Sequence, residues 1–263
     1  MKFYAMVSNT DTYLDNAQKQ YKIWKKSRKK YSKSVSDIIK IFNLKDENKF
    51  QTKKSPKYWA GDIHLNPKFI IVSLNPGDPK IGKIRRSNDS KGWDAYIENR
   101  KTWFTTKHFQ KSPYWQTNYK LICGMENKIP EKPMDGNFLL ENVLNLNLFP
   151  YHSNESDNFP SKFTVKQLEV ILHHLVLLFD LIEKKKPKYC FFNGKVWVTL
   201  LTKHELFPIK FEQVPYKKIS MYFGKKGKTH YVIFSKFLSS THYEGIGNDD
   251  LICGIPKLIK KHS

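Results

Sequence analysis

The stretch Lys68-Phe-Ile-Ile-Val-Ser-Leu-Asn-Pro-Gly-Asp-Pro79 decides the fold that we expect for this chain. Its first half, residues 69–72, is apolar, and a short apolar run closed by proline and glycine is typical of a strand buried in a parallel sheet. Pro76 fixes φ and removes a donor, while Gly77 allows a turn or a close approach to a ligand. Because α/β folds bind ligands at the carboxyl ends of parallel strands, Asn75 is expected in a binding crevice. The alternative is that Asn75-Pro76-Gly77 forms only a turn at the end of the strand.

Three later segments have the same form, a short apolar run followed by polar or turn residues. These runs lie at 143–149, 189–192 and 231–234. Apolar residues at helical spacing predict helices over 168–182, behind a capping box that begins at Thr164, and over 196–201. The alternation predicts an α/β protein with a three-layer α/β/α domain, built on a central, mainly parallel four-stranded sheet. We place this domain at residues 56–263.

Two basic regions flank the first strand. Residues 1–55 are predicted to be a basic helical N-terminal extension packed on the core. Its cations form either a solvated helix face or an arm that follows a phosphate backbone. Residues 80–120 are basic and aromatic without a clean period, which favours a substrate-facing insertion over core. Most of their rings are expected to be structural, and one of them could stack on a base.

The second predicted strand carries two amides inside an apolar run, Asn145 and Asn147. A buried amide is costly unless it has a hydrogen-bond partner. Asn147 lies near the carboxyl end of its strand, as Asn75 does. An amide offers a donor and an acceptor, which suits the Watson–Crick edge of a pyrimidine. The alternative is a side chain that bonds the backbone of a neighbouring loop.

The charge of the chain indicates a polyanionic partner. There are 46 Lys and Arg against 24 Asp and Glu, a net charge of +22, and nucleic acid is the first candidate. The excess is mostly lysine, which can also reflect an AT-rich genome. The 14 Tyr, 18 Phe and 6 Trp favour nucleic acid, because aromatic rings stack on bases while cations hold phosphates.

The cysteines and the hydropathy bound the cellular setting. Cys123, Cys190 and Cys253 form no C-x-x-C pair, which favours a reducing compartment and excludes a four-cysteine metal or iron–sulfur site within one chain. The N-terminus does not resemble a signal peptide, and the longest apolar segment, 175–179, is too short to span a membrane. We therefore expect a soluble cytoplasmic monomer that has no membrane partner and needs no metal or cofactor.

A loop after the fourth predicted strand, residues 238–248, is rich in Ser, Gly and His and leads into a final helix. Backbone N–H groups and hydroxyls ahead of a helix are suited to binding phosphate. This loop is therefore a candidate contact for a nucleic-acid backbone.

Three short motifs between residues 60 and 253 resemble the uracil-DNA glycosylase superfamily. Ser73-Leu-Asn-Pro-Gly77 resembles its first motif, most closely that of the mismatch-specific and single-strand-selective branches, which have Asn before the Pro. Leu146-Asn-Leu-Phe-Pro150 is similar to the strand whose Asn contacts the base. Leu238-Ser-Ser-Thr-His242 stands where a His-Pro-Ser motif is usual. The chain is a divergent match, because Ser73 replaces the usual Gly and the last motif has no Pro.

The resemblance implies a monofunctional DNA glycosylase, which flips a nucleotide out of double- or single-stranded DNA and hydrolyses its N-glycosidic bond to leave an abasic site. Asn75 would hold the attacking water, Asn147 would bind the base edge, and His242 would stabilise the departing base. The remaining implied contacts are Pro76 and Gly77 at the base, and Ser239, Ser240, Lys80, Lys83, Arg85 and Arg86 at the DNA phosphates.

The substrate implied is uracil or a modified pyrimidine. The large aromatic insert and the high charge suggest a bulkier base than uracil, as in modified foreign or phage DNA. Two other classes remain open: a non-catalytic nucleic-acid-binding module on the same fold, and a hydrolase of free nucleosides or nucleotides. The positive charge argues against the second.

Overall fold

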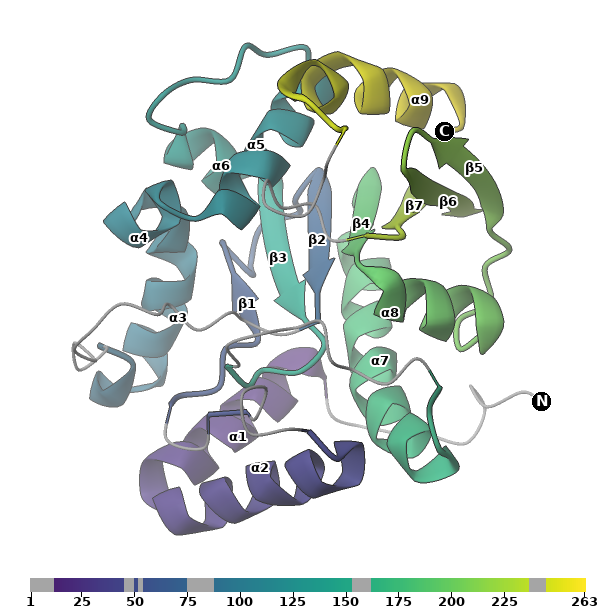
Figure 1. Ribbon diagram of the computed structural model, residues 1–263. Helices are drawn as coiled ribbons and strands as arrows, with labels where there is room; N and C mark the ends of the chain where they lie inside the picture. Colours follow the sequence, from purple (N-terminus) through teal and green to yellow (C-terminus); the bar gives the residue numbers. More distant parts are fainter. Residues whose placement is uncertain (1–11, 45–49, 52–53, 75–87, 153–161, 237–244) are drawn as a thin grey trace. The chain divides into compact units, whose positions relative to one another are not determined.

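A computed structural model describes residues 12–44, 50–51, 54–74, 88–152, 162–236 and 245–263 (Figure 1). Its sheet has seven strands in the order β1-β3-β2-β4-β7-β6-β5. The strands are β1 (Trp59–Ala60), β2 (Phe69–Ser73), β3 (Val143–Asn147), β4 (Tyr189–Asn193), β5 (Glu212–Tyr216), β6 (Ile219–Lys226) and β7 (Thr229–Phe234). All four strands expected from apolar runs are present, and every residue of β2, β3 and β4 is buried.

The α/β class is confirmed, but the expectation of a four-stranded, mainly parallel sheet is wrong. β4 pairs in parallel with β2 and with β7, whereas β5–β6 and β6–β7 are antiparallel and contribute the larger part of the described residue pairings. The additional strands come from the lysine-rich stretch that precedes β7. Burial alternates along β6, with Ile219, Met221 and Phe223 inside, but glycine and lysine interrupt that pattern in the sequence.

The hairpin between β6 and β7 turns later than the sequence suggests. The sequence Gly224-Lys-Lys-Gly227 by itself suggests a turn, yet β6 continues to Lys226 and the reversal begins at Gly227, where φ is 59°. Gly224 instead lies within the strand, where a Cβ would come within 2.4 Å of Ile209 Cγ2. Glycine is therefore required at 224 for packing and at 227 for backbone conformation.

The chain divides into two compact units that interleave along the sequence. The first comprises Met1–Ala60, Ser73–Arg100 and Leu146–Lys184, and the second comprises Gly61–Val72, Lys101–Asn145 and Lys185–Ser263. The predicted division at residue 55 stays a prediction, although helices in residues 1–55 are confirmed for the described part. These are α1 (Tyr13–Lys26) and α2 (Arg28–Phe42), in purple in Figure 1.

The first unit is held together by aromatic packing. α1 and α2 each turn one apolar stripe inward, made of Tyr13, Ala17, Tyr21 and Trp24 on α1, and Tyr31, Val35, Ile39 and Phe42 on α2. Phe42 packs edge-on against Phe149, with ring centroids 5.4 Å apart. The long helix α7 (Val165–Lys185) begins at the expected capping box, in which Gln167 N–H donates to Thr164 Oγ1 over 3.3 Å and Gln167 Oε1 accepts from Thr164 N–H over 3.0 Å.

Short helices explain the aromatic region 88–120. They are η3 (Asn88–Lys91), α3 (Trp93–Lys101), η4 (Thr102–Thr105), α4 (Lys107–Gln110) and α5 (Pro113–Met125). Tyr96, Phe104 and Phe109 are fully buried, and Trp115 and Tyr119 are nearly so. The structural role expected for most of these rings is confirmed. The expectation that this region lies outside the core is wrong for residues 88–120, because frequent helix breaks hide its amphipathic pattern.

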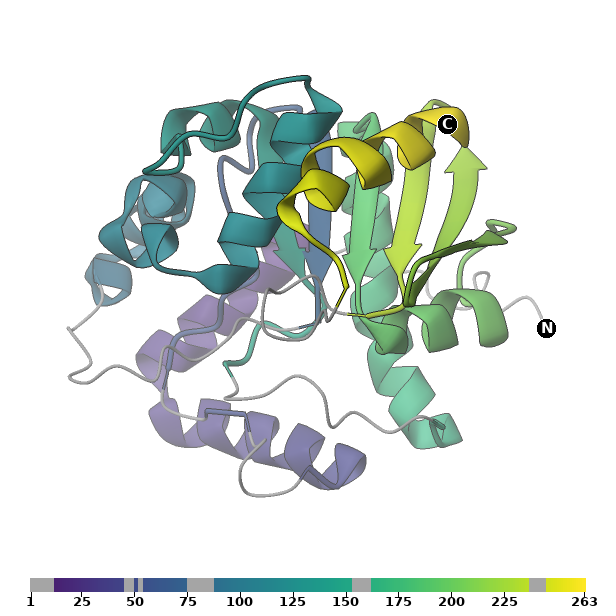
Figure 2. The same cartoon turned by 45° about the horizontal axis from the view of Figure 1, so that its top comes forward.

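The second unit contains the remaining helices, α6 (Gly136–Asn142), α8 (Lys195–Val198) with η5 (Thr199–Lys203), and η6 (Asp250–Gly254) leading into α9 (Ile255–Lys261). Figure 2 shows α9 alongside α5. The approach is close at Gly124 of α5, where a Cβ would meet the Ile252 carbonyl oxygen of η6 at 2.2 Å and Pro256 Cγ of α9 at 2.7 Å. Cys123 and Cys190 are buried free thiols, and Cys253 is an exposed one.

Candidate functional site

Backbone hydrogen bonds connect the segments that follow β2 and β3 at their carboxyl ends. Leu148 N–H donates to the Ser73 carbonyl over 2.9 Å, and Phe149 N–H donates to the Leu74 carbonyl over 2.8 Å. The partners advance together along both chains, as in a parallel pair. The chain leaves β2 towards β3 on one side of the sheet and leaves β4 towards β5, β6 and β7 on the other, so the connections diverge between the carboxyl ends of β2 and β4. Such a switch point is where open α/β sheets bind ligands.

Asn75, Pro76 and Gly77 directly follow this joined exit in the sequence and lie outside the described residues. The same holds for the predicted contacts Lys80, Lys83, Arg85, Arg86, Ser239, Ser240 and His242. Of the predicted site residues, the structure therefore places Asn147, the last residue of β3.

Asn147 is held by the segment that precedes β1. Its backbone N–H donates to the Tyr58 carbonyl and its Nδ2 donates to the Lys57 carbonyl, both over 2.9 Å. The side chain is 4% exposed. This is the backbone contact that the sequence left open as the alternative. One amide N–H is committed to the protein, and that bond fixes the orientation in which Oδ1 and the second N–H could meet a ligand.

Asn145 has a structural role. Its Nδ2 donates to the Ile71 carbonyl over 2.9 Å and so ties β3 to β2. This partner offsets the cost of burying an amide that is only 7% exposed.

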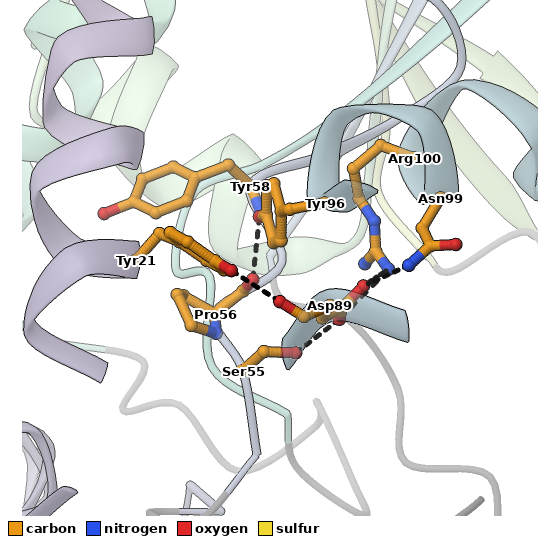
Figure 3. Close-up of polar contacts among 8 residues, drawn as sticks. All are labelled: Tyr21, Ser55, Pro56, Tyr58, Asp89, Tyr96, Asn99 and Arg100. Carbon is orange, nitrogen blue, oxygen red and sulfur yellow. Dashed lines mark hydrogen bonds and ion pairs between the residues drawn. The ribbon is translucent and has the colours of Figure 1, made fainter. Parts of the chain in front are cut away.

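The segment that orients Asn147 is itself clamped by tyrosines. Tyr13 Oη donates to the Tyr58 carbonyl over 2.6 Å. Tyr96 Oη donates to the Pro56 carbonyl over 2.7 Å (Figure 3). Burial raises the pKa of both Tyr13 and Tyr96, so both stay neutral donors at any ordinary pH. The amide of Asn147 is therefore positioned by a backbone segment that two buried tyrosines hold in place.

A buried ion pair fixes the chain just after residues 75–87. Asp89 is fully buried and Arg100 is 5% exposed, with Arg100 Nη2 at 3.0 Å from Asp89 Oδ1. Ser55 Oγ donates to Asp89 over 2.6 Å, Asn99 Nδ2 donates over 2.9 Å, and Tyr21 Oη donates to the Asp89 carbonyl over 2.6 Å (Figure 3). Burial alone would raise the pKa of Asp89, but Arg100 and these donors hold that pKa below its usual value.

The stretch that carries Asn75 is thus anchored at both sides by the first unit. Before it, Ser73 and Leu74 are bonded to the β3 exit, and after it, Asp89 is locked into the ion-pair cluster. Sequence reasoning missed Asp89 and Arg100. Their only signal is a pair of opposite charges 11 residues apart in a polar stretch, which many solvated surfaces share.

In the second unit, a polar residue also ends β4. Asn193 is 2% exposed, and its Nδ2 lies 3.3 Å from both Tyr114 Oη and Asn118 Oδ1. Its Oδ1 is buried and has no hydrogen-bond partner within the described part of the chain. Gly194 follows with φ at 111°, and its N–H donates to the Phe234 carbonyl. The sequence indicated only a turn here.

The described end of the 238–248 loop binds a carboxylate of the protein itself. Gly247 N–H donates to Asp250 Oδ2 over 2.7 Å, while Tyr216 Oη and Lys217 Nζ bind the same carboxylate over 2.7 and 2.6 Å. The hydrogen bonds from Lys217 and Tyr216 lower the pKa of Asp250 to about 2. The Gly247 N–H therefore already has an anionic partner within the protein.

The ranges that the structure describes contain neither a cluster of metal ligands nor a membrane-spanning helix. No group of three His, Cys, Asp or Glu side chains gathers there as a metal site. His173 is exposed, and His174 is half-buried against Phe149. Within the same ranges, no helix combines the length and the apolarity needed to cross a membrane.

No protein-family model matches the sequence, and no curated protein matches it significantly.

Proposed function

We propose that the protein is a monofunctional DNA glycosylase of the uracil-DNA glycosylase type, acting as a monomer on intracellular DNA. The observation that carries the proposal is the hydrogen-bonded exit of β2 and β3, next to the switch point between β2 and β4, with the amide of Asn147 in a fixed orientation. The net charge of +22 supports a DNA substrate, and three free thiols fit a reducing compartment.

In this mechanism the enzyme flips one nucleotide out of the stack, and glycosidic cleavage passes through an oxocarbenium-like state. Asn75 holds the attacking water. Because an amide is a poor base, positioning and electrostatic stabilisation carry most of the rate. Asn147 binds the base edge, with Pro76 and Gly77 beside it. His242 stabilises the departing base anion, and Ser239 and Ser240 hold a flanking phosphate.

The first test is base release. Purified protein is incubated with single-stranded and duplex DNA that carries uracil, mismatched thymine, hydroxymethylcytosine or glucosylated cytosine. Abasic sites are detected by alkaline cleavage and the freed base by mass spectrometry. Release of one base establishes the reaction and identifies its substrate. Tight binding without release from any substrate would instead favour a non-catalytic binding module, and release from free nucleosides alone would favour a nucleoside hydrolase.

Replacing Asn147 tests its proposed contact with the base. We expect Asn147→Asp to change the rank order of released bases, because a carboxylate is an acceptor only and loses the N–H offered to the base. A lost or mispaired hydrogen bond of this kind costs about 1–3 kcal/mol, or roughly 10- to 100-fold in relative rate. The measurement is the ratio of kcat/KM for two substrates.

The control for this experiment is Asn145→Asp, which alters the amide that ties β3 to β2. A general loss of stability would lower every substrate equally in both variants. An unchanged ratio in Asn147→Asp would remove this residue from base recognition.

A further inference from the structure

The α1–α2 hairpin, residues 13–42, separates its apolar and charged residues completely. The two helices pack on each other and bury their apolar stripes within the first unit (Figure 1). All the cations of the hairpin are exposed; they are Lys19, Lys22, Lys25, Lys26, Arg28, Lys29, Lys30, Lys33 and Lys40. Its acidic residues are Asp15 and Asp37, and Asp15 is used in the N-terminal cap with Thr12. One charge sign therefore dominates this face.

Most of these cations cluster around Ser27, where α1 ends and α2 begins. Lys25 and Lys26 lie in the last turn of α1, and residues 28–30 are the first three residues of α2. No ion pair within the described chain involves the lysines of this cluster or the nearby Lys33; the cluster lysines are Lys25, Lys26, Lys29 and Lys30. The structure holds these like charges together without compensating them.

The first turn of α2 is also electrostatically unfavourable. It contains three cations and no acidic residue, although the positive end of the helix dipole favours acidic residues there. The Ser27 side chain accepts from Lys30 N–H over 3.3 Å and caps the helix, but it carries no charge. Residues that oppose the helix dipole in this way are typical of a functional surface. A bound polyanion would turn this repulsion into attraction.

One of the cations has a restricted orientation. The Arg28 guanidinium lies over the ring of Trp24, 3.7 Å from its centroid, and Trp24 itself is buried. Stacking of this kind restricts the guanidinium, so less entropy is lost when it contacts a phosphate.

We propose that the α1–α2 hairpin is a docking surface for the phosphate backbone of DNA. This inference rests on the proposed function for the identity of the polyanion, and it adds the surface that holds the polymer. Nucleic acid fits better than a membrane. An interfacial amphipathic helix inserts apolar side chains, whereas the large exposed hydrophobic residues of the described chain, Leu65, Ile129 and Val165, all lie outside the hairpin.

The test is binding of a fluorescent 20-base-pair duplex, measured by anisotropy over a range of salt. The hairpin variant carries Gln at 25, 26, 29 and 30. Gln keeps a similar length and helix propensity, so the variant should fold normally, which circular dichroism verifies. The matched control has the same charge change in the second unit, with Gln at the exposed Lys203, Lys210, Lys225 and Lys228.

We expect the hairpin variant to bind at least about 30-fold more weakly at 100 mM salt, and its slope of log K against log salt to be smaller by about 2 to 4. The control should lose less than about 3-fold. Equal losses in both variants would reduce the effect to net charge and overturn the proposal, as would an unchanged affinity of the hairpin variant. Hairpin-dependent binding of phosphatidylserine vesicles as tight as that of DNA would assign the surface to membranes instead.

The same experiment separates this proposal from the proposed function. Base release is measured for each protein at DNA concentrations that saturate it. Hairpin-dependent binding without base release by the wild-type protein would refute the glycosylase and leave the docking surface standing. Base release by a protein whose DNA binding does not depend on the hairpin would refute the docking surface and leave the glycosylase standing.

Discussion

Asn75→Ala is expected to lower the single-turnover rate of base release by roughly 100- to 1,000-fold while DNA binding is unchanged. The amide has one proposed task, which is to hold the attacking water in line with the glycosidic bond. Loss of one positioning or stabilising group in an active site typically costs this much. DNA affinity comes from phosphate contacts that the substitution leaves in place. The measurements are abasic-site formation at saturating enzyme and anisotropy with the same duplex.

Asn75→Asp gives this experiment a chemical control. A carboxylate also binds water and is a stronger base than an amide, so we expect it to restore at least part of the lost rate. Asn137→Ala, at an exposed position of α6, is the control for removing an asparagine elsewhere. Full activity in Asn75→Ala would refute the proposed mechanism, and weakened DNA binding with an unchanged rate would assign Asn75 to binding alone.

Arg100→Met is expected to lower the free energy of unfolding by about 3–5 kcal/mol, because it leaves the fully buried Asp89 carboxylate without its countercharge. Adding Asp89→Asn should recover part of this loss. An amide carries no charge; its oxygen can accept from Asn99, which donates to Asp89 Oδ1, and its NH2 group can donate to the Ser55 hydroxyl, which lies at Oδ2. Urea denaturation at neutral pH measures both variants. The matched control is Lys184→Met, which breaks an exposed pair with Asp180 and should change little.

The same pair predicts a pH dependence with a definite sign. The folded-state pKa of Asp89 is lowered, so its contribution to stability is complete above the usual carboxyl range, near pH 4, and is lost as the pH falls through the folded-state value. In Arg100→Met, burial raises the pKa of the unpaired carboxyl, and acidification relieves its charge. The stability difference between the two proteins should therefore shrink from neutral pH towards pH 3. A constant difference would show that the ion pair does not supply the stability.

Elements that depend on consecutive residues could be predicted from the sequence. Three central strands, β2, β3 and β4, are unbroken buried runs, and α7 has both a regular apolar period and a capping box. β1 has two residues and β5 is largely exposed, so neither has a hydrophobic signal. The mixed sheet could not be anticipated, because its antiparallel edge begins at β5, which has no such signal.

The candidate site was predictable only in part. The position of Asn147 at a strand end follows from the apolar run and Pro150, and the structure places it there. Its partner is the carbonyl of Lys57, 90 residues away, and no local pattern identifies such a contact. The same is true of Tyr21, which reaches Asp89 across 68 residues. Pairings of this kind are set by tertiary packing and not by sequence spacing.

The contrast among the three cysteines offers a practical route to these measurements. Burial raises the pKa of the Cys123 thiol to about 11 and raises that of Cys190 as well, so neither forms the reactive thiolate near neutral pH. Cys253 is exposed on η6. A maleimide dye should therefore attach to the unmodified protein at a single, known position, which gives a fluorescent reporter without an engineered cysteine.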